Sequence, residues 1–315
     1  MGLASRSAQA RKLWSLTSAY QTFGATVAAG KLLGLDEPGM SSAMAIAYSQ
    51  LAASEQGSSE GAFVVTGMLQ QGLAAKAAIS SALLAQKGIT GLKDVIASYY
   101  RSYEQGEYDP QALVADFGQK FQGVYLGVKP YACCRTAQAS VHAILDIIAE
   151  SDVKPEDVDE VTVLVNEATY DATCQPLEAK RNPKTSLDAQ FSLPYCVASA
   201  LVRRKSLIED FTDEAIADVR VLELAKRVKP ALNPEVKGRF GRPPAVVQLK
   251  SRDGKAYSRR EEYIKGSLRN PLTEDEPLEI YPVEPPPKPM PQPPPSDNGF
   301  KKAFDEYVST REKCN

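Results

Sequence analysis

The side chains best suited to chemistry lie in one short segment, where Lys129 and Pro130 lead into Cys133, Cys134 and Arg135. A lysine in a proline-bounded turn presents a cation, and a cysteine supplies a nucleophile when its thiol is ionised. Arg135 follows the thiols and would lower a thiol pKa, whereas most cysteines in apolar surroundings are small buried side chains. The segment therefore predicts a candidate site in which the cysteines have two interpretations.

The chain contains a single histidine, His142, which falls among apolar residues of a predicted helix. One imidazole leaves most histidine metal sites without ligands and disfavours a Ser-His-Asp triad. The glycines at 24, 30 and 34 belong to a helical pattern and do not form a phosphate-binding GxGxxG motif. We therefore expect a structural role for His142, and no metal, nucleotide or other cofactor.

The composition is that of an ordinary globular protein, with 43% hydrophobic and 24% charged residues. A net charge of -2 gives no reason to expect nucleic-acid binding. No run approaches the roughly 20 apolar residues of a membrane helix, and the N-terminus lacks the apolar core of a signal peptide. Five cysteines in 315 residues do not make a disulfide framework. We expect a cytoplasmic protein with reduced thiols and a small-molecule partner.

These candidate residues need elements to position them, and the first part of the chain is predicted to be helical. Apolar and small residues recur at helical spacing over four segments: Thr17–Leu33, Met40–Ala53, Leu73–Gln86 and Leu92–Tyr103, with Thr90 as a possible N-cap of the last. Because alanine, serine and glycine allow helices to approach closely, we expect a compact all-helical block.

The middle of the chain changes to a mixed pattern. Val158–Val165 is β-branched and partly alternating, which predicts a strand. A hairpin is predicted where Asp253-Gly254 separates Ala245–Lys250 from Tyr257–Arg260. Two helices are expected in between, near Leu187–Val202 and Asp213–Arg227. The fold class is therefore α+β.

Four parts follow from this pattern. We expect a helical domain over residues 1–124, an α+β lid over 125–275, a proline-rich extended tether over 276–298 and a C-terminal helix over 299–315. Phe300, Phe304 and Tyr307 fall on one face of that last helix, so we expect it to return to the helical domain.

Five segments, in this order along the chain, carry a family resemblance: TFGATVAAGKLLGL (22–35), LAAKAAISSALLAQKGITG (73–91), KPYACC (129–134), DAQFSLPY (188–195) and GSLRNPL (266–272). Together they resemble the MmgE/PrpD family, which includes 2-methylcitrate dehydratase and cis-aconitate decarboxylase. The resemblance implies a large all-helical domain, a smaller α+β lid, an active site between them and a homodimer. The family's upstream segment precedes residue 1, so we expect an N-terminally shortened member.

The resemblance also assigns site residues. Lys129 and Tyr170 match a lysine and a tyrosine of the family site, whereas Ser15 and Cys134 stand where the family has histidines, and Gly67 where it has a lysine. We take Lys129, Tyr170 and Cys134 as the catalytic candidates. The substrate-binding candidates are Trp14, Ser15, Gly67, Gln70, Arg135 and Gln138.

Loss of these ionisable groups predicts a larger and more neutral pocket. Such a pocket binds tricarboxylates poorly, because buried carboxylates without cations carry a large desolvation cost. We therefore expect an isomerase or cyclase of specialised metabolism, pericyclic chemistry included, that orients a mainly apolar natural-product intermediate. Two alternatives remain open: a cofactor-free lyase, a dehydratase or decarboxylase, that acts on a small polycarboxylate with Lys129 and Tyr170 as its proton-transfer pair, and a catalytically dead binding or scaffold protein.

Overall fold

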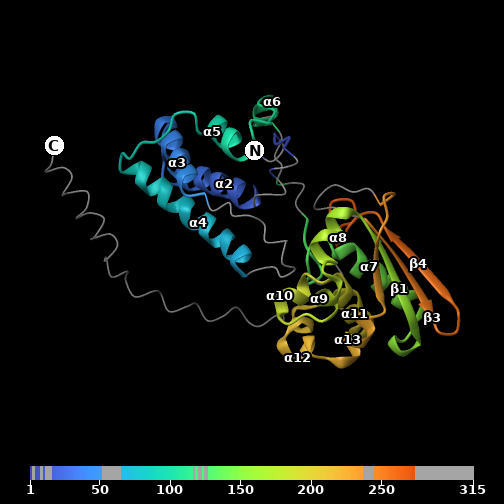
Figure 1. Ribbon diagram of the computed structural model, residues 1–315. Helices are drawn as coiled ribbons and strands as arrows, with labels where there is room; N and C mark the ends of the chain where they lie inside the picture. Colours follow the sequence, from blue (N-terminus) through green and yellow to red (C-terminus); the bar gives the residue numbers. More distant parts are fainter. Residues whose placement is uncertain are drawn as a thin grey trace.

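A computed structural model describes residues 1, 4–7, 10, 16–51, 65–115, 118–119, 123, 127–236 and 244–273. Figure 1 shows helices α2 to α6 as one body and the sheet with the later helices as another. The expected fold class, a helical part with an α+β part, is confirmed. The predicted tether, the predicted C-terminal helix and the candidates Trp14 and Ser15 lie outside the described residues.

Three long helices form the centre of the helical part. α2 (Leu16–Leu32), α3 (Glu37–Ser49) and α4 (Val65–Gln86) pack against one another. The shorter α5 (Val95–Tyr103) packs on α3, and α6 (Gln111–Val114) follows it. The buried positions on these helices include many alanines, which allow the close approach expected from the composition.

A buried carboxylate lies inside this part. Glu104, which is fully buried, accepts a hydrogen bond of 2.6 Å from the hydroxyl of Tyr20. Burial and this bond raise the pKa of Tyr20 to about 12. The two side chains therefore form a polar contact inside the core that the apolar spacing did not indicate.

Three predicted helix starts were wrong. α3 begins at Glu37 rather than at Met40, and its N-cap is Asp36. α4 begins at Val65 rather than at Leu73, because packing against α2 and α3 outweighs the low helix propensity of Gly72. α5 begins at Val95 rather than at Leu92, and its N-cap is Asp94 rather than Thr90. The Asp94 carboxylate accepts a hydrogen bond from the Ala97 amide at 3.3 Å, which satisfies a free donor of the first turn.

The sheet of the α+β part has the order β2-β1-β3-β4. Its strands are β1 (Val158–Val165), β2 (Val228–Leu232), β3 (Ala245–Ser251) and β4 (Ala256–Glu261). β1 pairs in parallel with β2, whereas β1–β3 and β3–β4 are antiparallel. The strand over 158–165 and the hairpin are thus confirmed, and alternate residues of β1 and β3 are buried.

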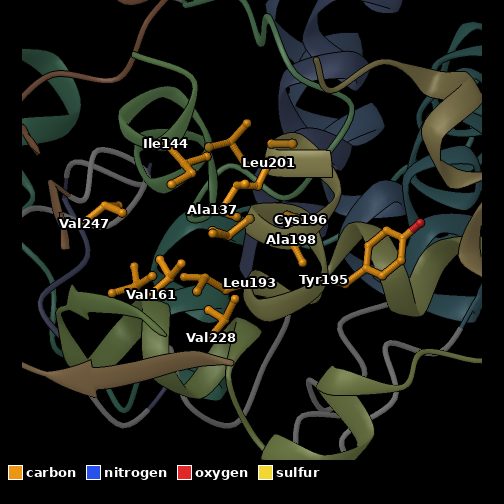
Figure 2. Close-up of a cluster of buried hydrophobic side chains, with 14 of the residues drawn as sticks. Ala137, Ile144, Val161, Leu193, Tyr195, Cys196, Ala198, Leu201, Val228 and Val247 are labelled. Carbon is orange, nitrogen blue, oxygen red and sulfur yellow. The ribbon is translucent and has the colours of Figure 1, made fainter. Parts of the chain in front are cut away.

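Helices pack on this sheet around one large core. α7 (Gln138–Ser151) lies on β3 and β4, and α11 (Leu193–Arg203) packs against α7, β2 and α13 (Val219–Ala225). Figure 2 shows Ile144, Leu193, Leu201, Val161 and Val247 meeting in this core. The remaining helical segments are α8 (Glu167–Thr173), α9 (Leu177–Arg181), α10 (Ser186–Gln190), α12 (Asp213–Ile216) and the single 3₁₀ turns η2 (Pro155–Asp157) and η3 (Ile208–Phe211).

The two helices predicted in this part are each divided in two. The first breaks between α10 and α11, where the Ser192 hydroxyl accepts from the Tyr195 amide at 3.0 Å and caps a new helix. The second breaks where Asp218 caps α13. β2 was not predicted because Pro230 argues against a strand, and the structure tolerates it because β2 is an edge strand.

Candidate active site around Cys134 and Lys180

The loop that carries Lys129 is anchored to a turn far along the chain. The Val128 amide donates to the Gly266 carbonyl at 2.8 Å. Gly266 has φ of +78°, and a Cβ built on it would lie 2.3 Å from the Val128 carbonyl oxygen. The guanidinium of Arg135 also reaches Val128, at 3.4 Å from its carbonyl. The exposed Lys129 is therefore presented by a loop fixed on both sides.

Gln138 supports the same loop from inside. It is fully buried, and its amide donates to the carbonyls of Tyr131 at 2.7 Å and Cys133 at 3.2 Å. The Tyr131 hydroxyl in turn lies 2.7 Å from Nδ1 of His142. These contacts give Gln138 and His142 positions behind the loop, where they hold Tyr131.

Cys134 lies half-buried between the loop and α10. Its amide donates to the Gln190 carbonyl at 2.8 Å, and its thiol lies 3.3 Å from the Thr136 hydroxyl. Burial raises the pKa of Cys134, while the Thr136 contact and the charge of Lys129 oppose that rise. The thiol form is therefore favoured over the thiolate, and Lys129 lies close enough to act on it electrostatically.

Lys180 is a buried lysine near Cys134 that the sequence did not single out. It is only 5% exposed, and its amine donates to the Phe191 carbonyl at 2.9 Å. Burial lowers the pKa of Lys180, and the charges of Asp188 and of the thiols Cys174 and Cys134 act in the opposite direction. The Cys134 amide and the Lys180 amine thus bond to the adjacent carbonyls of Gln190 and Phe191, which brings a second amine into the neighbourhood of Cys134.

Tyr170 lies on α8, and its membership of the site with Lys129 stays a prediction. It is half-buried against the large core, and its carbonyl accepts from the amide of Cys174 at 2.9 Å. Cys174 is fully buried, and burial raises its pKa to about 12 while the charge of Lys180 lowers it. Lys180 therefore acts electrostatically on Cys174, which follows α8, and it also interacts with Cys134 of the loop before α7.

Two parts of the chain match models of known protein domains. Residues 1–109 match the MmgE/PrpD N-terminal domain and residues 131–279 the MmgE/PrpD C-terminal domain, which together cover most of the chain. The chain belongs to the MmgE/PrpD family. The fold and the order of its two parts agree with that membership.

Two fungal relatives are named as a cis-aconitate decarboxylase and as a cis-aconitate decarboxylase-like protein. The chain is 26% identical over 238 residues to a cis-aconitate decarboxylase of Aspergillus terreus, covering 70% of this chain and 48% of that protein. It is 24% identical over 219 residues to a cis-aconitate decarboxylase-like protein of Aspergillus oryzae, covering 64% of this chain and 44% of that protein. The chain thus spans about half the length of these relatives.

The other MmgE/PrpD site candidates lie in the helical part. Gly67 and Gln70 belong to α4, and the Gln70 side-chain carbonyl accepts from the Ser18 hydroxyl at 3.3 Å. They are on a different body from Lys129 and Tyr170, so their place in one shared site remains a prediction. Among the described helices, none combines the length and the apolar character needed to cross a membrane.

One cluster in the α+β part has residue types that metals prefer. His142, Asp146 and Glu261 place their ligand atoms within 4.8 Å of one another. However, the guanidinium of Arg259 donates to Asp146 at 2.6 Å and to Glu261 at 3.1 Å. Because a cation already pairs with both carboxylates, the cluster is an ion-pair network between α7 and β4.

Two surface hollows also lie away from the predicted site. One, of about 340 Å³, is lined by Met40, Met44, Val95 and neighbouring residues of the helical part. The other, of about 450 Å³, lies beside Val202, Arg220 and Leu224. Neither has a lysine–thiol arrangement, so the group around Cys134 is the better candidate for chemistry.

Proposed function

We propose that this MmgE/PrpD chain acts as a cofactor-free lyase that removes CO2 or water from a small polycarboxylate. Membership of the family supports this class, and so do the names of the two Aspergillus relatives. The observation that carries the proposal is that two lysines lie near Cys134: Lys129 acts on its thiol electrostatically, and the Lys180 amine bonds to the Phe191 carbonyl next to the Gln190 carbonyl that Cys134 holds. Cations placed in this way are what carboxylate groups require.

In this mechanism Lys129 holds a carboxylate of the substrate by a charge-assisted hydrogen bond. In a decarboxylation the C–C bond to the departing CO2 breaks, its electron pair stays on the substrate, and a proton is delivered to that carbon. In a dehydration a C–H proton is removed as the C–O bond breaks, and the hydroxyl group takes up a proton and leaves as water. Tyr170 and Lys129 form the proton-transfer pair, with Tyr170 on α8 and Lys129 on the loop before α7. Cys134 lines the space beside Lys129 as a neutral thiol.

The relatives favour this lyase over the isomerase or cyclase expected from the loss of ionisable groups. That expectation assumed a neutral pocket, and the position of Lys180 supplies a cation that the sequence comparison did not include. The isomerase or cyclase, its apolar substrate, the homodimer and the cytoplasmic location therefore stay predictions.

Turnover is the direct test. The purified chain should convert cis-aconitate or 2-methylcitrate, followed by proton NMR of substrate and product. Lys129→Ala and Tyr170→Phe should each lower kcat/KM roughly 10- to 100-fold without unfolding the protein. Lys184→Ala, at an exposed lysine of the same part, is the matched control and should leave kcat/KM unchanged. No turnover of either acid by the folded protein would contradict the lyase and favour a scaffold role.

A further inference from the structure

Lys180 is unusual among the described residues because its amine is buried without an ion-pair partner. It is 5% exposed, and its single acceptor is the Phe191 carbonyl at 2.9 Å. An ammonium group has three donors, so two of them have no acceptor in this arrangement. A buried cation with unfilled donors is costly unless an anion or another acceptor joins it.

Asp188 is the carboxylate with the largest electrostatic effect on Lys180, but it does not accept a hydrogen bond from the amine. Asp188 on α10 acts on Lys180 only at longer range, and Lys180 forms no ion pair within the part of the chain that the structure describes. Instead the Asp188 carboxylate accepts from the Thr185 amide at 3.2 Å, while the Thr185 hydroxyl accepts from the Asp188 amide at 3.1 Å. Asp188 is therefore committed to the capping box of α10.

Three thiols on other elements act on the amine electrostatically. Cys134 belongs to the loop before α7, Cys174 follows α8 and Cys196 lies in α11. All three thiols have pKa values raised by burial, which keeps them neutral and leaves the lysine without a negative neighbour in contact. Cys134 is the only one of the three that is not fully buried, so a ligand would approach Lys180 past Cys134.

We propose that Lys180 is a carboxylate-binding residue of the active site, which takes one carboxylate of the substrate while Lys129 takes another. This inference rests on the proposed function and adds a second lysine that holds an acid group of the polycarboxylate. The substrate carboxylate supplies the acceptors that the amine lacks. Its binding therefore offsets the cost of keeping the ammonium group away from water.

A purely structural role for Lys180 has to be separated from this one. The amine joins α9 to the turn before α11, and the Ser192 hydroxyl donates back to the Lys180 carbonyl. Lys180→Gln retains a donor for the Phe191 carbonyl but loses the charge, whereas Lys180→Met loses both. A structural role predicts that only the methionine variant suffers, and a binding role predicts that both lose the ligand.

The experiment is a calorimetric titration of the full chain with propane-1,2,3-tricarboxylate, a saturated acid that has no double bond or hydroxyl group to react. Lys180→Gln should weaken binding about 10- to 100-fold, the usual effect of losing a charged hydrogen bond. Lys184→Gln is the matched control and should bind as the unaltered chain does. Equal affinity for the Lys180→Gln variant would overturn the inference.

The pH dependence gives a second readout. Only the protonated amine attracts a carboxylate, and burial lowers the pKa of Lys180 below the ordinary lysine value. Affinity should therefore be constant at low pH, above the pKa values of the acid, and should fall as pH rises through that lowered pKa. The fall should disappear in Lys180→Gln, and its persistence there would assign it to another group and contradict the inference.

The two proposals fail separately. Binding of the saturated acid that depends on Lys180, without turnover of cis-aconitate or 2-methylcitrate, would contradict the lyase and support the carboxylate site. Turnover that Lys180→Gln leaves unchanged in both kcat and KM would support the lyase and contradict the role of Lys180. Absence of any binding to the folded chain would contradict the inference directly.

Discussion

At the scale of single residues, the candidate site depends on polar side chains that hold the loop carrying Lys129 and Cys134 in place. Gln138 was predicted to bind substrate, but its amide is occupied by the Tyr131 and Cys133 carbonyls and it is fully buried. His142 was expected to be structural, and it contacts the Tyr131 hydroxyl. Both hold the loop in which Lys129 and Cys134 lie.

Replacing Gln138 by leucine tests this bracing. The change leaves the buried Cys133 carbonyl and the partly buried Tyr131 carbonyl without this donor. An unsatisfied group costs about 1–3 kcal/mol, so the free energy of unfolding should fall by roughly 2–6 kcal/mol. Chemical denaturation followed by circular dichroism measures it. Gln248→Leu, at an exposed position of β3, is the control and should change stability little. Equal effects of the two substitutions would show that the Gln138 contacts do not stabilise the loop.

At the scale of elements, the position of Lys129 is set by a contact between the loop at 127–130 and the turn at 266–270. The Val128 amide donates to the carbonyl of Gly266, whose positive φ shapes the start of that turn. The Gly266 amide donates to the Asn270 carbonyl at 2.8 Å, so the turn is closed on itself. The GSLRNPL segment therefore acts as a support for the KPYACC segment.

Gly266→Ala should disturb this support strongly. Gly254 also has positive φ, but no atom lies within 4 Å of the position that an added methyl group would take, so Gly254→Ala isolates the backbone strain of about 1–2 kcal/mol. At Gly266 the methyl group meets the Val128 carbonyl oxygen at 2.3 Å, which adds a packing cost of about 1–3 kcal/mol. Thermal unfolding of both variants checks this. Similar losses would mean that the loop moves aside freely.

At the scale of the whole molecule, each of the two bodies contains a tyrosine whose ionisation is suppressed. Tyr20 in the helical part bonds to Glu104, and Tyr195 in α11 donates to the Asp210 carbonyl at 2.9 Å. Burial raises the pKa of both to about 12. High pH should therefore act on both parts of the chain, although they have separate cores.

Stability should fall as pH rises from about 10 to about 12. Over this range the unfolded tyrosines lose their protons near their usual pKa while the folded ones keep theirs, so the folded state binds more protons and the free energy of unfolding decreases. Below pH 10 the contribution is fully present. Denaturation curves measured across this range should be flatter for the double variant Tyr20→Phe/Tyr195→Phe. Tyr263→Phe, at an exposed site, should leave the slope unchanged.

The sequence determined the parts of the molecule in which local pattern decides the outcome. Alternation of valines placed β1 at 158–165, and the Asp-Gly turn placed the hairpin of β3 and β4. The segment with Lys129, Cys134 and Arg135 was found from residue types alone, because its members are neighbours in the chain. Helix ends were less predictable, since caps such as Asp94 and Ser192 compete with other polar residues nearby.

Tertiary structure decided which distant residues meet. Pro230 made a strand at β2 unexpected from the sequence. A strand is possible there because β2 pairs with β1 alone at the edge of the sheet, where a proline is tolerated. Lys180 reads as an ordinary charged residue in a short polar segment, yet packing of α9 against α11 buries its amine among thiols from three other elements. Periodicity records which side of an element faces inward, but it carries no information on which element lies opposite. The burial of Lys180 beside Cys134 is therefore a property of the packed molecule.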